Sequence, residues 1–224
     1  MAACGLAFGS SLYAQAEAAT FSLTPFTGDN AKVFVTLDQL VNGNIDVKVE
    51  VDKSVALADL RGIFFNVKTE AILPKLNIIN PSTGVGAFKF AANSVNEVGG
   101  VKLEGEPNLN PCVPIGCDGG IEIGQNGLKG GKDDFQSVSW TFARTDGQAL
   151  SLADFEGMSW GIRATSVGAP GSSRGGSTKL SGIVPTTPKP EQPREIPEPT
   201  ATLAFFAVAA GALTTLRHKA AEQA

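Results

Sequence analysis

Apolar and polar residues alternate along the middle of the chain. In 44–51 every second residue is isoleucine or valine, and the residues between them are polar or charged. The same period of two recurs in 137–144 and in 158–164. Because successive side chains of a strand point to opposite faces, each segment predicts a strand with one buried face. Shorter strands are predicted at 32–37, 62–67, 85–90, 121–123 and 179–184.

Turn-forming residues separate these segments. The 224 residues include 26 glycines and 13 prolines, and the middle of the chain has no convincing helical period. About eight to ten short strands joined by turns are typical of two antiparallel sheets packed face to face. We therefore predict an all-β fold, a two-sheet antiparallel β-sandwich of the jelly-roll or immunoglobulin-like kind, over residues 20–184.

One stretch is partly repeated further along the chain. Residues 57–65 read LADLRGIFF, and residues 152–160 read LADFEGMSW. We expect both to form a strand–turn–strand connection, in which Asp59 and Asp154 each cap a short helical turn. The alternative is a pair of catalytic carboxylates. It is less favoured because capping turns are far commoner than catalytic pairs.

The first residues have the pattern of a secretory signal peptide. Residues 2–13 are small and apolar, and the alanines at 14, 16 and 18 then form two overlapping Ala-x-Ala cleavage patterns. No lysine or arginine precedes the apolar run. We therefore predict a signal peptide, truncated at its start, over residues 1–19. The alternative is a buried first strand or helix.

The last forty residues have three successive parts. Six of the fifteen residues in 185–199 are proline, which predicts an extended linker over 185–196. Residues 200–216 carry no charge, and as a helix these seventeen residues would be roughly 25 Å long, near the short limit for crossing a bilayer. We predict a single C-terminal transmembrane helix there. A core or amphipathic helix is the alternative, disfavoured because apolar residues occupy every face.

A basic cluster follows this predicted helix directly, before the short tail 220–224. Its residues are Arg217, His218 and Lys219. Basic residues beside a membrane span stay on the cytoplasmic side, so the β-domain is expected outside.

The order of these parts resembles the PEP-CTERM sorting signal of Gram-negative bacteria and cyanobacteria. The resemblance covers residues 197–219: a Pro-Glu-Pro triad, an apolar helix and a basic cluster. It implies an exosortase, a membrane transpeptidase, as partner, and recognition through Pro197, Glu198 and Pro199. It also implies an inner-membrane single-pass precursor and a mature domain at the cell surface or in the extracellular matrix. Segments of the middle region resemble the exported domain that often precedes such a tail in cyanobacteria, a family that carries no established function. They are residues 59–67, 131–137, 152–155, 161–168 and 175–180, and the resemblance would cover roughly 20–184.

The net charge and the few histidine, cysteine and tryptophan residues limit the functions that the chain could have. A net charge of −4 argues against nucleic acid as a partner, and the single histidine, His218, removes His-dependent catalysis from the predicted β-domain. Cys112 and Cys117 are expected to form a small disulfide loop, with a redox or metal site as the alternative. Trp140 and Trp160 alternate with apolar neighbours and are expected in the core, not as sugar-stacking platforms.

Four carboxylates in a glycine-rich region form the one candidate metal site. A calcium ion could be bound there by carboxylates and loop carbonyls, although solvated loop charges are the favoured interpretation and no cofactor is expected. These residues are Asp118, Glu122, Asp133 and Asp134.

Together these features predict a non-enzymatic, exported surface or matrix protein. Its expected partners are an exosortase, the membrane during a transient single span, and matrix polysaccharide. Two alternatives stay open: a carbohydrate-binding module of the exopolysaccharide matrix, and a glycan hydrolase that uses paired carboxylates.

Overall fold

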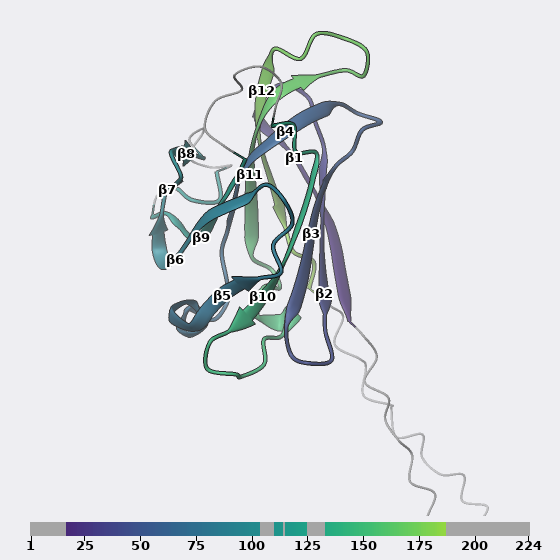
Figure 1. The fold of residues 1–224 in the computed structure, drawn as a ribbon. Helices are drawn as coiled ribbons and strands as arrows, with labels where there is room; N and C mark the ends of the chain where they lie inside the picture. The colour runs from purple at the N-terminus through teal and green to yellow at the C-terminus, as the bar shows by residue number, and fades with distance from the viewer. Residues whose placement is uncertain (1–16, 104–109, 114, 125–132, 187–224) are drawn as a thin grey trace, which may run out of the picture. The chain divides into compact units, whose positions relative to one another are not determined.

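The computed structural model describes residues 17–103, 110–113, 115–124 and 133–186 (Figure 1). Strands dominate this part of the chain, and the helical elements are two short 3-10 helices. The elements are β1 (Ala18–Gly28), β2 (Val33–Gln39), β3 (Ile45–Val51), β4 (Leu57–Phe65), η1 (Glu70–Lys75), β5 (Leu76–Ile79), β6 (Val85–Val95), β7 (Glu97–Val98), β8 (Val101–Lys102), β9 (Cys117–Ile123), β10 (Ser137–Arg144), η2 (Leu152–Asp154), β11 (Ser159–Gly168) and β12 (Gly176–Ile183).

Ten of the strands form one large antiparallel sheet, and β7 and β8 form a small second sheet. The order in the large sheet is β5-β10-β3-β2-β1-β12-β11-β4-β9-β6. The long strand β1 links its two halves, because 18–23 pair with β2 whereas 24–28 pair with β12. A bulge between Pro25 and Thr27 marks this change of partner. The predicted all-β antiparallel class is confirmed, with the pairing continuous through β1.

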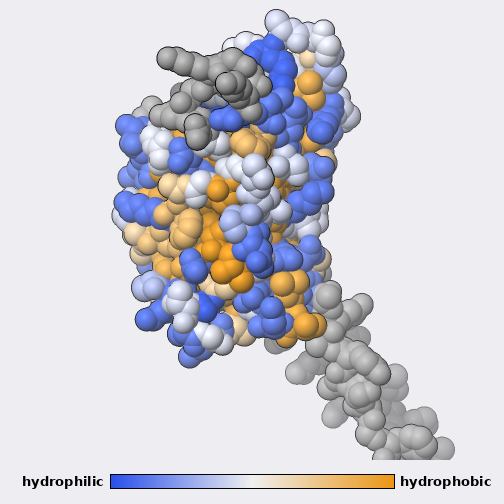
Figure 2. Space-filling model, in the orientation of Figure 1, coloured by the Kyte–Doolittle hydropathy of each residue, from blue (hydrophilic) through white to orange (hydrophobic). Residues whose placement is uncertain are grey.

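The large sheet is nearly closed. Its edge strand β6 faces β10, and the two meet through side chains: the rings of Phe90 and Phe142 lie 6.1 Å apart, edge to face. Phe88 stacks on Phe90 at 5.3 Å and is 41% exposed. Figure 2 shows apolar residues in the middle of this face, framed by hydrophilic ones, between the strands labelled β9 and β10 in Figure 1.

The main core fills the inside of the curved sheet. Trp140 and Trp160 are 2% and 0% exposed, so their predicted core positions are confirmed. Phe65 stacks on Trp160 with ring centroids 5.1 Å apart and tilts against Phe142 at 5.2 Å. Aromatic pairs of this kind add about 0.5–1.5 kcal/mol each beyond the area that they bury.

A second, smaller core lies on the outer face of β4, β9 and β11, the face turned away from the main core. The β7–β8 hairpin and the segment around Cys112 cover it. Glycines in the sheet allow this close approach: a Cβ on Gly62 would lie 2.8 Å from Val101 Cγ1, and one on Gly120 would lie 2.8 Å from Val95 Cγ1. This cover explains why β4 is buried on both faces.

The two similar sequence stretches adopt different structures. The prediction for Asp59 was wrong, because Leu57–Phe65 is an uninterrupted strand whose two faces are buried, one by the main core and the other by residues packed on the outside of the sheet. In the second copy a short helical turn does form, and Ser151 is its N-cap. Asp154 completes the capping box by accepting a hydrogen bond from the Ser151 backbone N–H.

The ends of the described region adjoin the predicted targeting segments. Strand β1 begins at Ala18, two residues before the expected start of the domain at residue 20, and β12 ends at Ile183. None of the helices in the described residues combines the length and the apolar character needed to cross a membrane. The predicted helix at 200–216 lies outside those residues.

Candidate functional site

Two charged residues are buried side by side in β4. Asp59 is 0% exposed and Arg61 is 4% exposed, and both lie on the outer face of the sheet. The segment before β10 covers Asp59: the Phe135 N–H donates to Asp59 Oδ1 at 2.9 Å, and Leu60 N–H donates to the Phe135 carbonyl at 2.8 Å. Buried charged groups are rare unless they are paired, which makes this pair a candidate functional feature.

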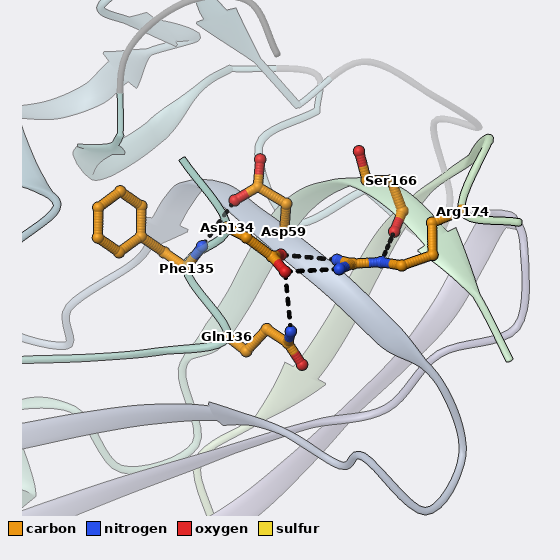
Figure 3. Close-up of polar contacts among 6 residues, drawn as sticks. All are labelled: Asp59, Asp134, Phe135, Gln136, Ser166 and Arg174. Carbon is orange, nitrogen blue, oxygen red and sulfur yellow. Dashed lines mark hydrogen bonds and ion pairs between the residues drawn. The ribbon is translucent and has the colours of Figure 1, made fainter. Parts of the chain in front are cut away.

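A two-point ion pair lies beside Asp59 (Figure 3). Arg174, in the β11–β12 connection, donates from Nη1 and Nη2 to the two carboxylate oxygens of Asp134 at 2.5 and 2.6 Å. Its Nε also donates to the Ser166 carbonyl at 2.9 Å. Ser166 has a φ of 49° and sits at the bulge of β11, which turns that carbonyl toward the guanidinium. Gln136 donates a further hydrogen bond to Asp134 at 3.1 Å.

The pKa values of the two carboxyl groups shift in opposite directions. Hydrogen bonding from Arg174 holds the pKa of Asp134 below its usual value. Burial raises the pKa of Asp59, and the Phe135 amide and the charge of Arg61 only partly offset this effect. The six residues drawn in Figure 3 include no thiol and no imidazole, and their contacts are ion pairs and hydrogen bonds.

A shallow groove of about 600 Å³ crosses the outer face of β2, β3 and β10. Asp38 and Asp46 line it and lie directly opposite each other in the β2–β3 pairing. Thr141 donates from its hydroxyl to Asp46 Oδ1 at 2.6 Å. Trp140 borders the groove but is only 2% exposed, so its ring is not a stacking surface. Other polar residues of this β2–β3–β10 groove are Asn42, Asn44, Lys48, Asn80, Ser82, Ser137 and Ser139.

Asp118, one of the four candidate calcium ligands, has a structural role in the fold. Its Oδ2 accepts from the Val67 N–H at 2.9 Å, and its Oδ1 accepts from the Asn93 N–H at 2.8 Å. Its own N–H donates to Asn66 Oδ1 at 3.1 Å. The carboxylate therefore joins the end of β4 to β6 across β9.

The other candidate calcium ligands lie in different surroundings. Glu122 packs against Gly99 of the outer cover, and Asp134 pairs with Arg174. Asp133 directly precedes Asp134 in the chain. Within the residues that the structure describes, no group of three or more His, Cys, Asp or Glu side chains is placed to hold a metal ion.

The predicted disulfide between Cys112 and Cys117 is present. Cys117 is the first residue of β9, and Cys112 belongs to the outer cover. Asn110 accepts from the Cys112 N–H at 2.9 Å, and the Gly116 N–H donates to the Cys112 carbonyl at 2.7 Å. The disulfide therefore fastens the outer cover to the sheet.

The remaining predicted site residues lie outside the described part of the chain. They are the triad Pro197, Glu198 and Pro199 and the basic cluster Arg217, His218 and Lys219. Conversely, sequence reasoning missed Arg61 and Arg174 and assigned Asp59 to a turn. The available signal was the polar pair Asp59 and Arg61 inside an otherwise apolar stretch.

Comparison with known proteins gives no assignment for this arrangement. No protein-family model, no curated protein and no solved structure matches the chain.

Proposed function

We propose that this chain is an exported, non-enzymatic protein that an exosortase recognises and processes through its C-terminal tail. Its precursor would cross the inner membrane once, with the β-domain outside. The mature domain would then reside at the cell surface or in the extracellular matrix. We also propose that the two halves of its large sheet pack as a sandwich of the jelly-roll or immunoglobulin-like kind.

The order of segments is the observation that carries this proposal. The β-domain completes its last strand at Ile183, and Val184 is still buried. The proline-rich stretch, the triad 197–199, the uncharged run 200–216 and the basic cluster follow in that order. The sorting features therefore lie in sequence beyond the last strand, where a membrane enzyme would reach them without unfolding the sheet.

The disulfide supports export independently of the tail. Disulfides persist in oxidising compartments and are rare in the cytosol. The bond between Cys112 and Cys117 fastens the cover of the second core, so a compartment that lets it form would stabilise this part of the fold.

Release of the β-domain from the membrane tests the proposal in cells that carry an exosortase. We expect Glu198→Gln to trap the full chain in the membrane while its β-domain remains folded. Glu191→Gln removes the same charge from the proline-rich stretch outside the triad and is expected to be released normally. Normal release of the Glu198→Gln chain would overturn recognition through the triad.

A second candidate function is carbohydrate binding in the β2–β3–β10 groove. The facing carboxylates of Asp38 and Asp46 favour it, because carboxylates accept hydrogen bonds from sugar hydroxyls. Like charges directly opposite each other destabilise a sheet, so a bound ligand would explain their placement. The same pair would serve the hydrolase alternative.

An assay with matrix glycans distinguishes the binding module from the hydrolase. A binding module is expected to retain the glycan and to lose it in the Asp38→Asn, Asp46→Asn double variant. A hydrolase would instead release new reducing ends that disappear in this variant. No retention and no cleavage by the unmodified chain would remove both.

A further inference from the structure

Unpartnered polar atoms gather on the outer face of β4 and β11. Nη1 and Nη2 of Arg61 and Oγ1 of Thr165 are buried and have no hydrogen-bond partner among the described residues. Asp59 Oδ2 is also buried without a hydrogen-bond partner among the described residues. Asp59 lies directly opposite Thr165 in the pairing of β4 with β11. Buried polar groups in folded proteins almost always have a partner, from the protein, from ordered water or from a ligand. This concentration of unpartnered atoms therefore calls for a missing partner.

A hollow of about 300 Å³ adjoins this part of the sheet. Arg61 and Thr165 line it from the sheet, and Lys102 of the covering hairpin lines it from outside; we call it the arginine pocket. Its described lining also includes Arg163 and Lys179 and contains no carboxylate. The chain as a whole has a net charge of −4, so the sign of the charge is reversed locally in this pocket.

Strand register brings the positive charges together. Arg163 of β11 lies directly opposite Lys179 of β12 on one side and opposite Gly62 of β4 on the other. Arg61 is the extra residue at the bulge of β4 between the partners of Arg163 and Ala164. Lys102 pairs with Glu97 at 3.4 Å, and Arg163 and Lys179 also have interactions of their own. The unmet hydrogen-bonding capacity is therefore that of Arg61 and Thr165.

We infer that the arginine pocket binds an oxyanion, the carboxylate or sulfate group of a small ligand or of an acidic sugar. Two parallel N–H donors of a guanidinium match two oxygens of such a group, and the Thr165 hydroxyl supplies a further donor. The volume equals that of about ten water molecules at about 30 Å³ each, which is enough for a small ligand. This inference does not depend on the proposed sorting of the chain.

Water alone would satisfy the hydrogen bonds of Arg61 but would not neutralise its positive charge. Asp59 attracts Arg61, but no hydrogen bond joins Asp59 Oδ2 to the guanidinium among the described residues. Burial also raises the pKa of Asp59, which weakens it as a counter-charge. An anion supplies both the acceptor atoms and the opposite charge.

Isothermal titration calorimetry on the purified full-length chain tests this inference. Sodium sulfate, sodium glucuronate and glucose are titrated at one ionic strength held with sodium chloride. We expect saturable one-to-one binding of sulfate and of glucuronate, and no binding of glucose. Tighter binding of glucuronate would identify a sugar acid as the source of the oxyanion, and equal binding would identify a simple oxyanion site.

Three variants locate the site. Arg61→Gln is expected to weaken binding at least about tenfold through loss of charge-assisted hydrogen bonds. Thr165→Val, nearly the same in shape, is expected to weaken it about threefold through loss of one hydrogen bond. Lys75→Gln removes a positive charge from an exposed residue at the end of η1, away from the pocket lining, and is expected to leave the affinity unchanged.

Several outcomes would overturn the inference. They are the absence of saturable binding by the unmodified chain, glucose binding equal to glucuronate binding, and unchanged affinity in both pocket variants. A thermal melt checks that each variant folds. If Arg61→Gln does not fold, unchanged affinity in Thr165→Val alone contradicts the inference.

Discussion

Arg174 holds Asp134 through two hydrogen bonds, although forty residues separate them in the chain. This pair connects the β11–β12 turn to the segment that covers Asp59. Because it is partly exposed to water, its coupling energy is expected to be about 1 kcal/mol or less near neutral pH. A double-mutant cycle with Asp134→Asn and Arg174→Gln, read by urea unfolding, measures this coupling.

The same cycle has a defined pH dependence. Arg174 lowers the folded-state pKa of Asp134, so the coupling is fully present above the ordinary value of 3.8 and is lost as the pH falls through the folded-state pKa. A coupling energy that persists unchanged in strong acid would show that the pair is not electrostatic.

Gly161 is expected to tolerate no side chain. A Cβ there would lie 2.7 Å from Pro111 Cγ and even closer to Leu103 Cδ2, so Gly161→Ala forces the outer cover away from β11. We expect a loss of about 1–3 kcal/mol in the free energy of unfolding, typical of overpacking. Gly175→Ala is the matched control, because an added Cβ would meet nothing within 4 Å. Equal stability of the two variants would contradict this description of the cover.

The disulfide is expected to stabilise the domain. Chain-entropy arguments for so short a loop give about 2 kcal/mol between the oxidised chain and the Cys112→Ser, Cys117→Ser double variant. Hydrogen exchange should also show faster opening at Val98 and Val101, which belong to the second core. Cys4→Ser is the control. Unchanged exchange at these two valines would show that the cover does not depend on the disulfide.

The variant Asp118→Asn tests whether this carboxylate has a structural role or binds calcium. Asp118→Asn replaces one acceptor oxygen with an NH₂ group that faces a backbone N–H, so we expect a loss of about 1–3 kcal/mol. The loss should be the same with calcium or with EDTA. A calcium-dependent rise in the melting temperature of the unmodified chain, absent from this variant, would instead identify a metal site.

The sequence predicted the strands that have one solvent-exposed face. It missed features that depend on contacts between residues far apart in the chain. The alternation in 44–51 and 137–144 located β3 and β10 almost to the residue. Strand β4 was misread at Asp59 because residues far along the chain bury its outer face: the segment before β10 covers Asp59, and residues 97–103 cover Gly62 and Phe64. Strand β1 was not expected, because its first residues overlap the cleavage patterns and Pro25 interrupts its apolar period.

The candidate sites likewise divide into those that local spacing predicts and those that depend on residues distant in sequence. The pairing of Cys112 with Cys117 followed from their spacing, since a short loop brings two cysteines together with few alternatives. Arg61 and Thr165 come together only through the register of β4 and β11, which local periodicity does not encode. The partners of Asp118 are likewise distant, because Val67 is fifty-one positions away.

The proposed sorting is tested most directly by the mass of the mature protein isolated from the cell surface. Mass spectrometry of its C-terminal peptide is expected to show a chain that ends at or near 197–199 and lacks Arg217, His218 and Lys219. A surface-located protein with these three residues intact would contradict exosortase processing.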